Sequence, residues 1–252
     1  MNPSVTMNKL IQFSTVLSFT LLNACGGSSS SNSTPETTTP TTTPPSSTAP
    51  ADTVTYELTF TQEWTAANFA TNYPSGTHFS PLVGLTHNLE GGIFKRDEVA
   101  SPGIVLMAET GGKSTLKNEI SDIQNAGHSN YLIDELGISN GSQSVAFTFE
   151  ASQDFPLLSV VSMIAPSPDW FVAINSLSLF NDNAWVESQT IELKVYDAGS
   201  DSGLRFSSGN LATDPAEPIT LLSSERDDTD FAEGIHHQTG KHIGYVEIKL
   251  MQ

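Results

Sequence analysis

Short stretches in which apolar and polar residues alternate recur along the chain after residue 52, and they constrain its fold more than any other feature. In Thr53–Phe60 every second residue, beginning with Val54, is apolar, so one face of an extended chain would be apolar. The same alternation, or a denser apolar run, occurs in residues 143–151, 159–165, 190–197 and 242–251. Gly, Pro, Asn or Asp residues bound these stretches, as they commonly bound strands. The pattern therefore predicts a domain built mainly of β-strands.

One stretch has the spacing of a helix instead. In Thr115–Gln124, the side chains of Leu116, Ile120 and Ile123 would fall on one side of a helix. No strand–helix–strand rhythm accompanies the predicted strands, so a parallel sheet is not expected. We therefore expect one all-β domain over residues 53–252, folded as an antiparallel β-sandwich with at most one or two short helices.

The first 25 residues have the layout of a secretory signal peptide. Lys9 precedes the apolar stretch Leu10–Leu22, whose length of about 13 residues is short of the about 20 that a membrane-spanning helix needs. The sequence "LNAC" ends at Cys25 and resembles the bacterial lipobox, in which a peptidase cuts before the cysteine and the thiol carries lipid. Asn23 departs from the small residue that is usual at its position. Cys25 is the single cysteine of the chain, so it cannot pair within that chain.

These observations predict how the protein is attached to the cell. We expect residues 1–25 to be a lipoprotein signal peptide, Cys25 to carry lipid, and the protein to be held on the bacterial outer membrane or cell surface. An uncleaved anchor, or a plain signal peptide with an incidental cysteine, is the alternative. Residues 26–52 are nearly all Ser, Thr, Pro and Gly, which bury too little apolar surface to fold. They are expected to form a disordered tether, extended by about 3 Å per residue where the chain is polyproline-like.

The composition argues against several classes of function. The chain carries 28 Asp and Glu residues against 10 Lys and Arg residues, a net charge of −18, which excludes nucleic acid as a partner. The acidic surplus is accounted for by the solubility of an exported protein, although a concentrated part of it could bind a divalent metal. The sequence has no GxSxG motif, no Gly-rich dinucleotide turn and no cysteine besides Cys25. We therefore do not expect an enzyme.

A pair of prolines interrupts one of the apolar stretches. In "MIAPSPDWFV" the prolines flank Ser167, and because proline lacks a backbone donor the strand should stop there and leave Asp169 at a sheet edge or sandwich tip. Farther along, Asp197 follows another predicted strand, and Asp201 lies beyond Gly199, which lets the chain turn back. From the residues alone, a Gly-rich turn with its capping aspartates and a carboxylate metal site both remain open.

Several stretches together resemble a known family. They are Phe79–Asn88, Val99–Ile120, Met163–Phe180 and Asp197–Gly203. In this order they resemble the spondin domain family, the amino-terminal module of F-spondin and mindin, which also occurs in bacterial exported proteins. The most specific elements are "PSPDW" and the later "DAGSDSG". Ala173 stands where the family tends to have glycine, "NLEGGIFKRDE" fits the family poorly, and the paired cysteines of animal members are absent.

The resemblance implies a β-sandwich similar to calcium-dependent lipid-binding domains, with a calcium ion at one tip. Carried over to this sequence, it implies that Asp169, Asp197 and Asp201 are the metal ligands. Oxygen ligands are those that Ca²⁺ selects, whereas zinc would call for His or Cys. An EF-hand is excluded, because the twelfth position of a loop starting at Asp197 is serine rather than glutamate. Trp170 is expected to pack under the loop and to fix Asp169, with an exposed contact for a partner as the alternative.

Other titratable residues are interpreted as structural. The histidines His236, His237 and His242 have no common zinc spacing and are expected to mark a turn before the last strand. His87 is expected to be a buried, hydrogen-bonding histidine. The acidic run Glu225–Asp230 is expected to be a solvated loop, with a weak second cation site as the alternative.

The function predicted from these features is that of a calcium-binding spondin domain that is exported, tethered to a membrane, and acts as a binding or adhesion module at the cell surface. Its partner is expected to be an extracellular or cell-surface ligand, and the sequence does not distinguish protein, glycan and lipid. A metal-dependent hydrolase of the cell envelope, using the same aspartates and an open metal position, is the alternative.

Overall fold

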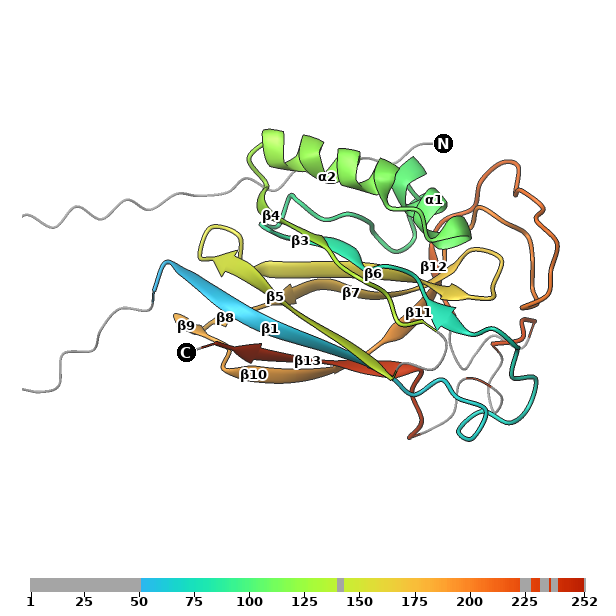
Figure 1. Cartoon of the computed structure of the whole chain (residues 1–252). Coiled ribbons are helices and arrows are strands. Elements are labelled where there is room, and N and C mark those ends of the chain that lie inside the picture. The colour runs from blue at the N-terminus through green and yellow to red at the C-terminus, as the bar shows by residue number, and fades with distance from the viewer. Residues whose placement is uncertain (1–50, 140–142, 223–227, 232–235, 237–239, 252) are drawn as a thin grey trace, which may run out of the picture. The chain divides into compact units, whose positions relative to one another are not determined.

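Two antiparallel β-sheets face each other in the computed structural model, which describes residues 51–139, 143–222, 228–231, 236 and 240–251 (Figure 1). The smaller sheet has the strand order β10 (Ser188–Glu192), β13 (Gly244–Leu250), β1 (Thr53–Gln62) and β5 (Ser144–Ser152). The larger sheet has the order β12 (Thr220–Leu221), β11 (Lys194–Asp197), β7 (Trp170–Ser178), β6 (Leu157–Ala165), β3 (Val83–His87) and β4 (Ser129–Asp134), with β2 (His78–Phe79) paired to β6. A separate hairpin joins β8 (Phe180–Asn181) to β9 (Ala184–Trp185). The predicted all-β sandwich is confirmed.

The core between the sheets is built by the alternation seen in the sequence. In β1, Tyr56 and Leu58 are buried, and each stands opposite an aromatic residue of β5, Phe149 and Phe147 respectively. The rings of Tyr56 and Phe149 stack with their centroids 5.6 Å apart. Pairs of this kind, facing the opposite sheet, stabilise a sandwich through both cross-strand contact and burial.

Two helices, α1 (Pro102–Thr110) and α2 (Ser114–Asn125), cover the outer face of the larger sheet (Figure 1). Their buried residues form a second core with residues of β3, β6 and β7, among them Ile104, Met107, Leu116, Ile120, Leu85, Val161 and Phe171. Because the helices lie on one face and the smaller sheet on the other, every residue of β6 is buried. This double burial explains the dense apolar run in residues 159–165.

Helix α2 confirms the predicted helix, whereas α1 was not predicted. Its start and end nevertheless carry ordinary helix signals. The side chain of Ser101 accepts a hydrogen bond from the Ile104 backbone N–H, Pro102 opens the first turn, and Gly111 closes the helix with φ of 72°. The apolar residues of α1 lack the one-sided spacing that identified α2, so only these capping signals could have found it.

The stretch 190–197, predicted as one strand, forms two strands in different sheets. Ser188–Glu192 pairs with β13 of the smaller sheet, while Lys194–Asp197 pairs with β7 of the larger one. Leu193, between them, is buried and donates its backbone N–H to the Gly244 carbonyl at 3.0 Å. The chain crosses between the sheets at this residue, and this crossing delivers Asp197 to the end of the larger sheet.

The two ends of the sandwich are formed by different segments of the chain. At the near end, where the described chain begins, the Ala51 carbonyl accepts hydrogen bonds from Trp185 Nε1 at 2.7 Å and Gln153 Nε2 at 3.2 Å. At the far end, β6 and β11 finish and β7 begins (Figure 1). Two segments lie at this far end. We call residues 166–169 the β6–β7 turn and residues 198–213 the tip loop.

The predicted signal peptide with Cys25, and all but the last two residues of the predicted tether, lie outside the described residues. Among the helices that the structure does describe, none is long and apolar enough to cross a membrane.

Candidate metal centre

Asp169 is the last residue of the β6–β7 turn. The strand stops at Ala165 and resumes at Trp170, so the prolines do end β6 and place Asp169 at the tip, as expected. Ser167 fastens the turn, because its Oγ accepts the Trp170 backbone N–H at 3.2 Å and donates to the Ile164 carbonyl at 2.5 Å. Asp169 is thereby fixed at the end of β6 and β7, two inner strands of the larger sheet.

The carboxyl group of Asp169 has no exposed surface, and only one of its oxygens is satisfied. Oδ2 accepts three hydrogen bonds from the tip loop: the Ser200 backbone N–H at 2.8 Å, the Ser200 hydroxyl at 3.2 Å and the Asp201 backbone N–H at 3.0 Å. Oδ1 is buried and has no hydrogen-bond partner within the described part of the chain. Burial, followed by the nearby charge of Asp197, raises the pKa of Asp169 to about 7.

Asp197 directly precedes the tip loop, and Asp201 lies near its start. Asp197 ends β11, directly opposite Trp170 in the sheet register, and its Oδ1 accepts the Gly199 backbone N–H at 2.9 Å. Gly199 has φ of 70°, and a Cβ at this position would lie 2.2 Å from the Glu217 carbonyl oxygen. A side chain is therefore excluded at Gly199 by both conformation and space. Asp197 is 9% exposed and Asp201 is 5% exposed.

The carboxylate of Asp201 already fastens the tip loop. Its Oδ1 accepts the Gly203 backbone N–H and its Oδ2 accepts the Leu211 backbone N–H, each at 2.7 Å. Among the residues that the structure describes, no three His, Cys, Asp or Glu side chains are gathered into a group that could hold a metal ion as they stand. The structure thus brings the three predicted aspartates to one tip. Each of them accepts at least one hydrogen bond from a backbone N–H, and Oδ1 of Asp169 is the oxygen left without a partner among the described residues.

A pocket of about 450 Å³ lies beside these residues. Asp197 and Asp201 line it together with Glu217 and Asp228. Asp228 is exposed, as expected for a solvated loop, and it also lines this pocket, so part of the acidic run borders the candidate site. Residues 225–227 of that run lie outside the described chain.

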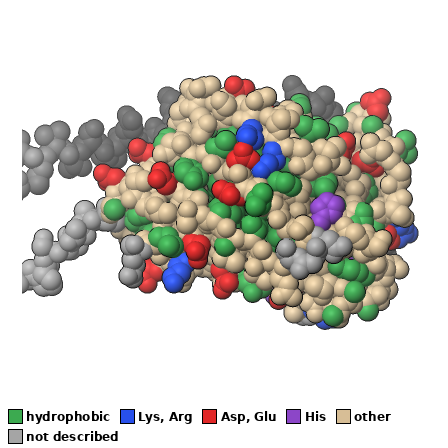
Figure 2. All heavy atoms as spheres, viewed as in Figure 1, with side chains coloured by type: hydrophobic (Ala, Val, Ile, Leu, Met, Phe, Trp, Pro, Cys, Tyr) green, Lys and Arg blue, Asp and Glu red, His purple; other side chains and the backbone are tan. Residues whose placement is uncertain are grey.

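The remaining negative charge is not concentrated in one patch on the face drawn in Figure 2. Acidic side chains there are spread among uncharged ones, with a few Lys or Arg residues between them. This distribution fits the interpretation that most of the charge serves solubility.

Trp170 packs beneath the tip loop, as expected. It is completely buried, and its ring contacts Phe206 of the tip loop at a centroid distance of 5.4 Å and Phe231 at 5.9 Å. His236 belongs to the same aromatic cluster, which the sequence did not indicate. Its Nδ1 accepts the Trp64 indole N–H at 2.9 Å, and burial lowers its pKa. His236 is thus part of the core.

The other histidines have separate roles. His87 is buried and shares a hydrogen bond with Ser159 Oγ at 2.8 Å, which confirms the predicted buried histidine. His242 lies before β13, with its ring nitrogens 3.5 Å from Glu192 and 4.0 Å from Glu63. His237 lies outside the described residues.

Comparison with known proteins gives a consistent result. The profile of the Spondin_N family matches residues 54–244. Spondin-2 of Homo sapiens is 33% identical over 173 residues, which cover 67% of this chain and 52% of that protein. Spondin-2 of Rattus norvegicus is 32% identical over the same shares, and Spondin-1 of Gallus gallus is 28% identical over 183 residues, or 68% of this chain and 22% of that protein.

The chain thus spans about half the length of the Spondin-2 proteins that it matches and about a fifth of Spondin-1. The family profile nevertheless covers the sandwich from β1 to the first residue of β13, including the β6–β7 turn and the tip loop. The chain belongs to the Spondin_N family.

Proposed function

We propose that this chain is an exported, membrane-tethered binding module with a calcium ion at its far end. One observation carries the calcium site: the buried Oδ1 of Asp169, which finds no hydrogen-bond donor among the described residues and lies near the charge of Asp197. An unpaired buried carboxylate oxygen costs free energy, and a like charge nearby adds to that cost. A divalent cation would remove both penalties at once.

The residues present would hold such an ion through oxygen alone. Asp169 and Asp197 would be side-chain ligands. Asp201 would share an oxygen that also accepts a backbone N–H, which a carboxylate oxygen allows because it has two lone pairs. Calcium takes six to eight oxygen ligands in irregular geometry and accepts carbonyls and water among them, whereas magnesium demands a compact octahedron. The ion would offset most of the negative charge of the three aspartates and tie the tip loop to the β6–β7 turn.

The position of the site supports a role in recognition. The chain enters the sandwich at the near end, at Ala51, while the candidate site lies at the far end. A ten-residue strand such as β1 spans about 33 Å between these ends. On a tether attached through lipid on Cys25, the far end can meet a protein, glycan or lipid outside the cell, and we assign binding or adhesion to it.

Calorimetry tests the calcium site. The mature chain without lipid, residues 26–252, is stripped with a chelator and titrated with calcium and then with magnesium. Calcium should bind and magnesium should bind more weakly. If no calcium binds up to millimolar concentrations, the three-aspartate site is wrong and "DAGSDSG" is only a turn.

Two further measurements test the tether and the ligand. A labelled fatty acid should enter the wild type but not Cys25→Ser, and only the wild type should partition with membranes; equal labelling would refute the lipid anchor. A glycan and lipid array probed with residues 26–252, with and without calcium, then tests for a glycan or lipid ligand.

A further inference from the structure

The tip loop is fastened at its base by Asp201. The two hydrogen bonds of its carboxylate reach Gly203 on one side of the loop and Leu211 on the other. The Ser202 backbone N–H also donates to the Leu211 carbonyl at 2.9 Å. The position of the Asp201 carboxylate therefore depends on the conformation of the whole segment between these residues.

The middle of the tip loop is inserted into the aromatic core. Phe206 is buried and contacts Trp170, the residue that directly follows Asp169. A Cβ at Gly203 would lie 2.7 Å from Cγ of Pro168, so the loop also touches the β6–β7 turn closely. The two halves of the candidate metal centre are thus coupled through the middle of the loop as well as through its base.

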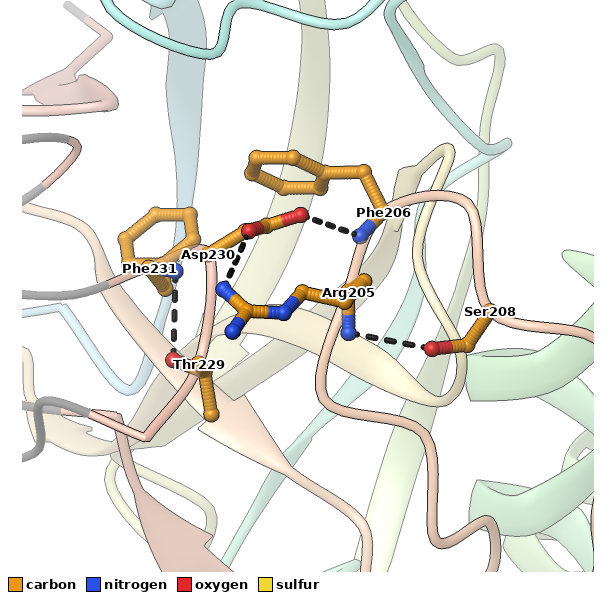
Figure 3. Close-up of polar contacts among 6 residues, drawn as sticks. All are labelled: Arg205, Phe206, Ser208, Thr229, Asp230 and Phe231. Carbon is orange, nitrogen blue, oxygen red and sulfur yellow. Dashed lines mark hydrogen bonds and ion pairs between the residues drawn. The ribbon is translucent and has the colours of Figure 1, made fainter.

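Asp230 holds this middle part in place (Figure 3). Its Oδ1 accepts a hydrogen bond from Arg205 Nη1 at 2.8 Å, and its Oδ2 accepts the Phe206 backbone N–H at 3.0 Å. Its own backbone N–H donates to the Leu204 carbonyl at 2.9 Å. Three consecutive loop residues are therefore bound by one aspartate, whose side chain is 14% exposed.

We propose that Asp230 is a positioning residue for the calcium site: it sets calcium affinity through the tip loop and is not itself a ligand. The inference rests on the proposed calcium site. It assigns a role to a residue that the sequence placed in a solvated loop, and it follows from the contacts of Asp230 with Leu204, Arg205 and Phe206. The bond to the Phe206 N–H is the central one, because it fixes the backbone beside the inserted ring. The Arg205 ion pair is more exposed and should matter less.

Three variants of residues 26–252 separate this role from a simple effect of charge. Asp230→Ala removes every side-chain contact and should weaken calcium binding about tenfold, the scale of one hydrogen bond to a charged group. Asp230→Asn keeps an acceptor for the Phe206 N–H and should fall between Asp230→Ala and the wild type. Arg205→Met removes only the ion pair and should weaken binding slightly. Calorimetry with calcium measures all three.

A charge effect would give a different order. If Asp230 acted only through its negative charge, Asp230→Asn and Asp230→Ala would weaken binding equally, and Arg205→Met would tighten it because a nearby positive charge is lost. That order, or affinities equal to the wild type throughout, would overturn the proposal. Asp154 is an exposed aspartate at the near end, so Asp154→Asn is the matched control and should bind calcium as the wild type does.

Hydrogen exchange of the calcium-free chain gives a second readout that does not depend on the metal. Asp230→Ala should speed exchange of the tip-loop amides of Gly203, Phe206 and Leu211 while leaving those of β1 unchanged. Unchanged exchange in the tip loop would overturn the positioning role even where calcium binds. If Asp230→Ala speeds exchange as expected but the wild type binds no calcium, the proposed calcium site fails while the role of Asp230 in holding the tip loop stands.

Discussion

The two ends of the larger sheet each bury a polar cluster, and the clusters differ in whether their hydrogen bonds are complete. At the near end, His87 Nδ1 donates to the Asn88 carbonyl at 2.6 Å and Nε2 accepts from Ser159 Oγ at 2.8 Å. Ser159 Oγ in turn accepts the Ser176 backbone N–H at 2.9 Å. At the far end, Oδ2 of Asp169 accepts three hydrogen bonds, yet Oδ1 of the same carboxyl group has no partner among the residues described.

The difference separates a structural cluster from a candidate binding site. Burial lowers the pKa of His87, so its imidazole is neutral and each ring nitrogen has one partner. Burial and a neighbouring carboxylate raise the pKa of Asp169, so its charged form is disfavoured unless something else compensates it. A buried polar group with complete partners stabilises a fold, whereas one with a missing partner requires an explanation, which a bound water or ion can supply.

The largest effect is expected from removing the near-end imidazole. His87→Ala should lower the free energy of unfolding by about 3–5 kcal/mol, the range for truncating a large buried ring, because it also leaves Ser159 without its acceptor. Urea unfolding measures the change with chelator and again with excess calcium. The loss should be the same in both, and His78→Ala, an exposed histidine, should cost far less. A loss that calcium restores would contradict the purely structural role of the near end.

The next prediction concerns pH, to which the two ends should respond in opposite directions. The raised pKa of Asp169 means that the calcium-free fold holds a proton more tightly than the unfolded chain does. Its stabilising contribution is complete below about pH 4 and is lost as pH rises through about 7, a change on the order of 4 kcal/mol. The lowered pKa of His87 acts the other way, with stability lost as pH falls below about 6.5.

Asp169→Asn isolates the far-end part of this response. His87 is present in both proteins, so its contribution cancels in the difference between their unfolding free energies. With chelator present, the wild type should lose stability relative to Asp169→Asn as pH rises from 4 to 8. A difference that stays constant over this range would show that the Asp169 carboxyl group is not buried in an unfavourable state.

Calcium should stabilise the fold through the far end alone. A ligand that binds only the folded state contributes about 2.7 kcal/mol at a hundredfold excess over Kd, seen as a rise in melting temperature. Asp169→Asn, Asp197→Asn and Asp201→Asn should each reduce this rise, and magnesium should produce a smaller one. Asp154→Asn serves as the control, because Asp154 is exposed at the near end. Asp228 is not a suitable control, because it lines the pocket beside the site. An undiminished rise in Asp169→Asn would remove the distinction between the two ends.

The sequence predicted the strands well where a single physical constraint acts on them. Strand β1 has one buried and one partly exposed face, so its alternation is clean. Residues 190–197 are apolar at regular intervals, yet Leu193 marks a change of sheet that spacing alone does not reveal. Helix α1 is apolar because it packs against both α2 and the larger sheet, and its apolar residues show no one-sided spacing that would have predicted a helix.

The candidate site was predicted in part. The strand-ending prolines and the Gly-rich turn located Asp169 and Asp197 correctly at one tip, since both features act locally. The hydrogen bonds of Asp201 to Leu211, and of Asp230 to Phe206, join residues ten or more positions apart. No local pattern encodes such contacts, so the engagement of Asp201 and the role of Asp230 became visible only in the structure.

The smallest effect tests where the near end begins. A chain starting at Ala51 should melt within about 1–2 °C of residues 26–252, because a Ser/Thr/Pro-rich segment contributes little to a core. A chain starting at Thr53 loses the Ala51 carbonyl, which accepts from the Trp185 indole and from Gln153, and should be less stable by about 1 kcal/mol, the net value of one buried hydrogen bond. Thermal unfolding compares the three chains, and calcium titration should give the same affinity for all of them. A lower calcium affinity in the Thr53 chain would mean that the two ends are coupled, and a large loss of stability in the Ala51 chain would mean that part of the tether packs on the sandwich.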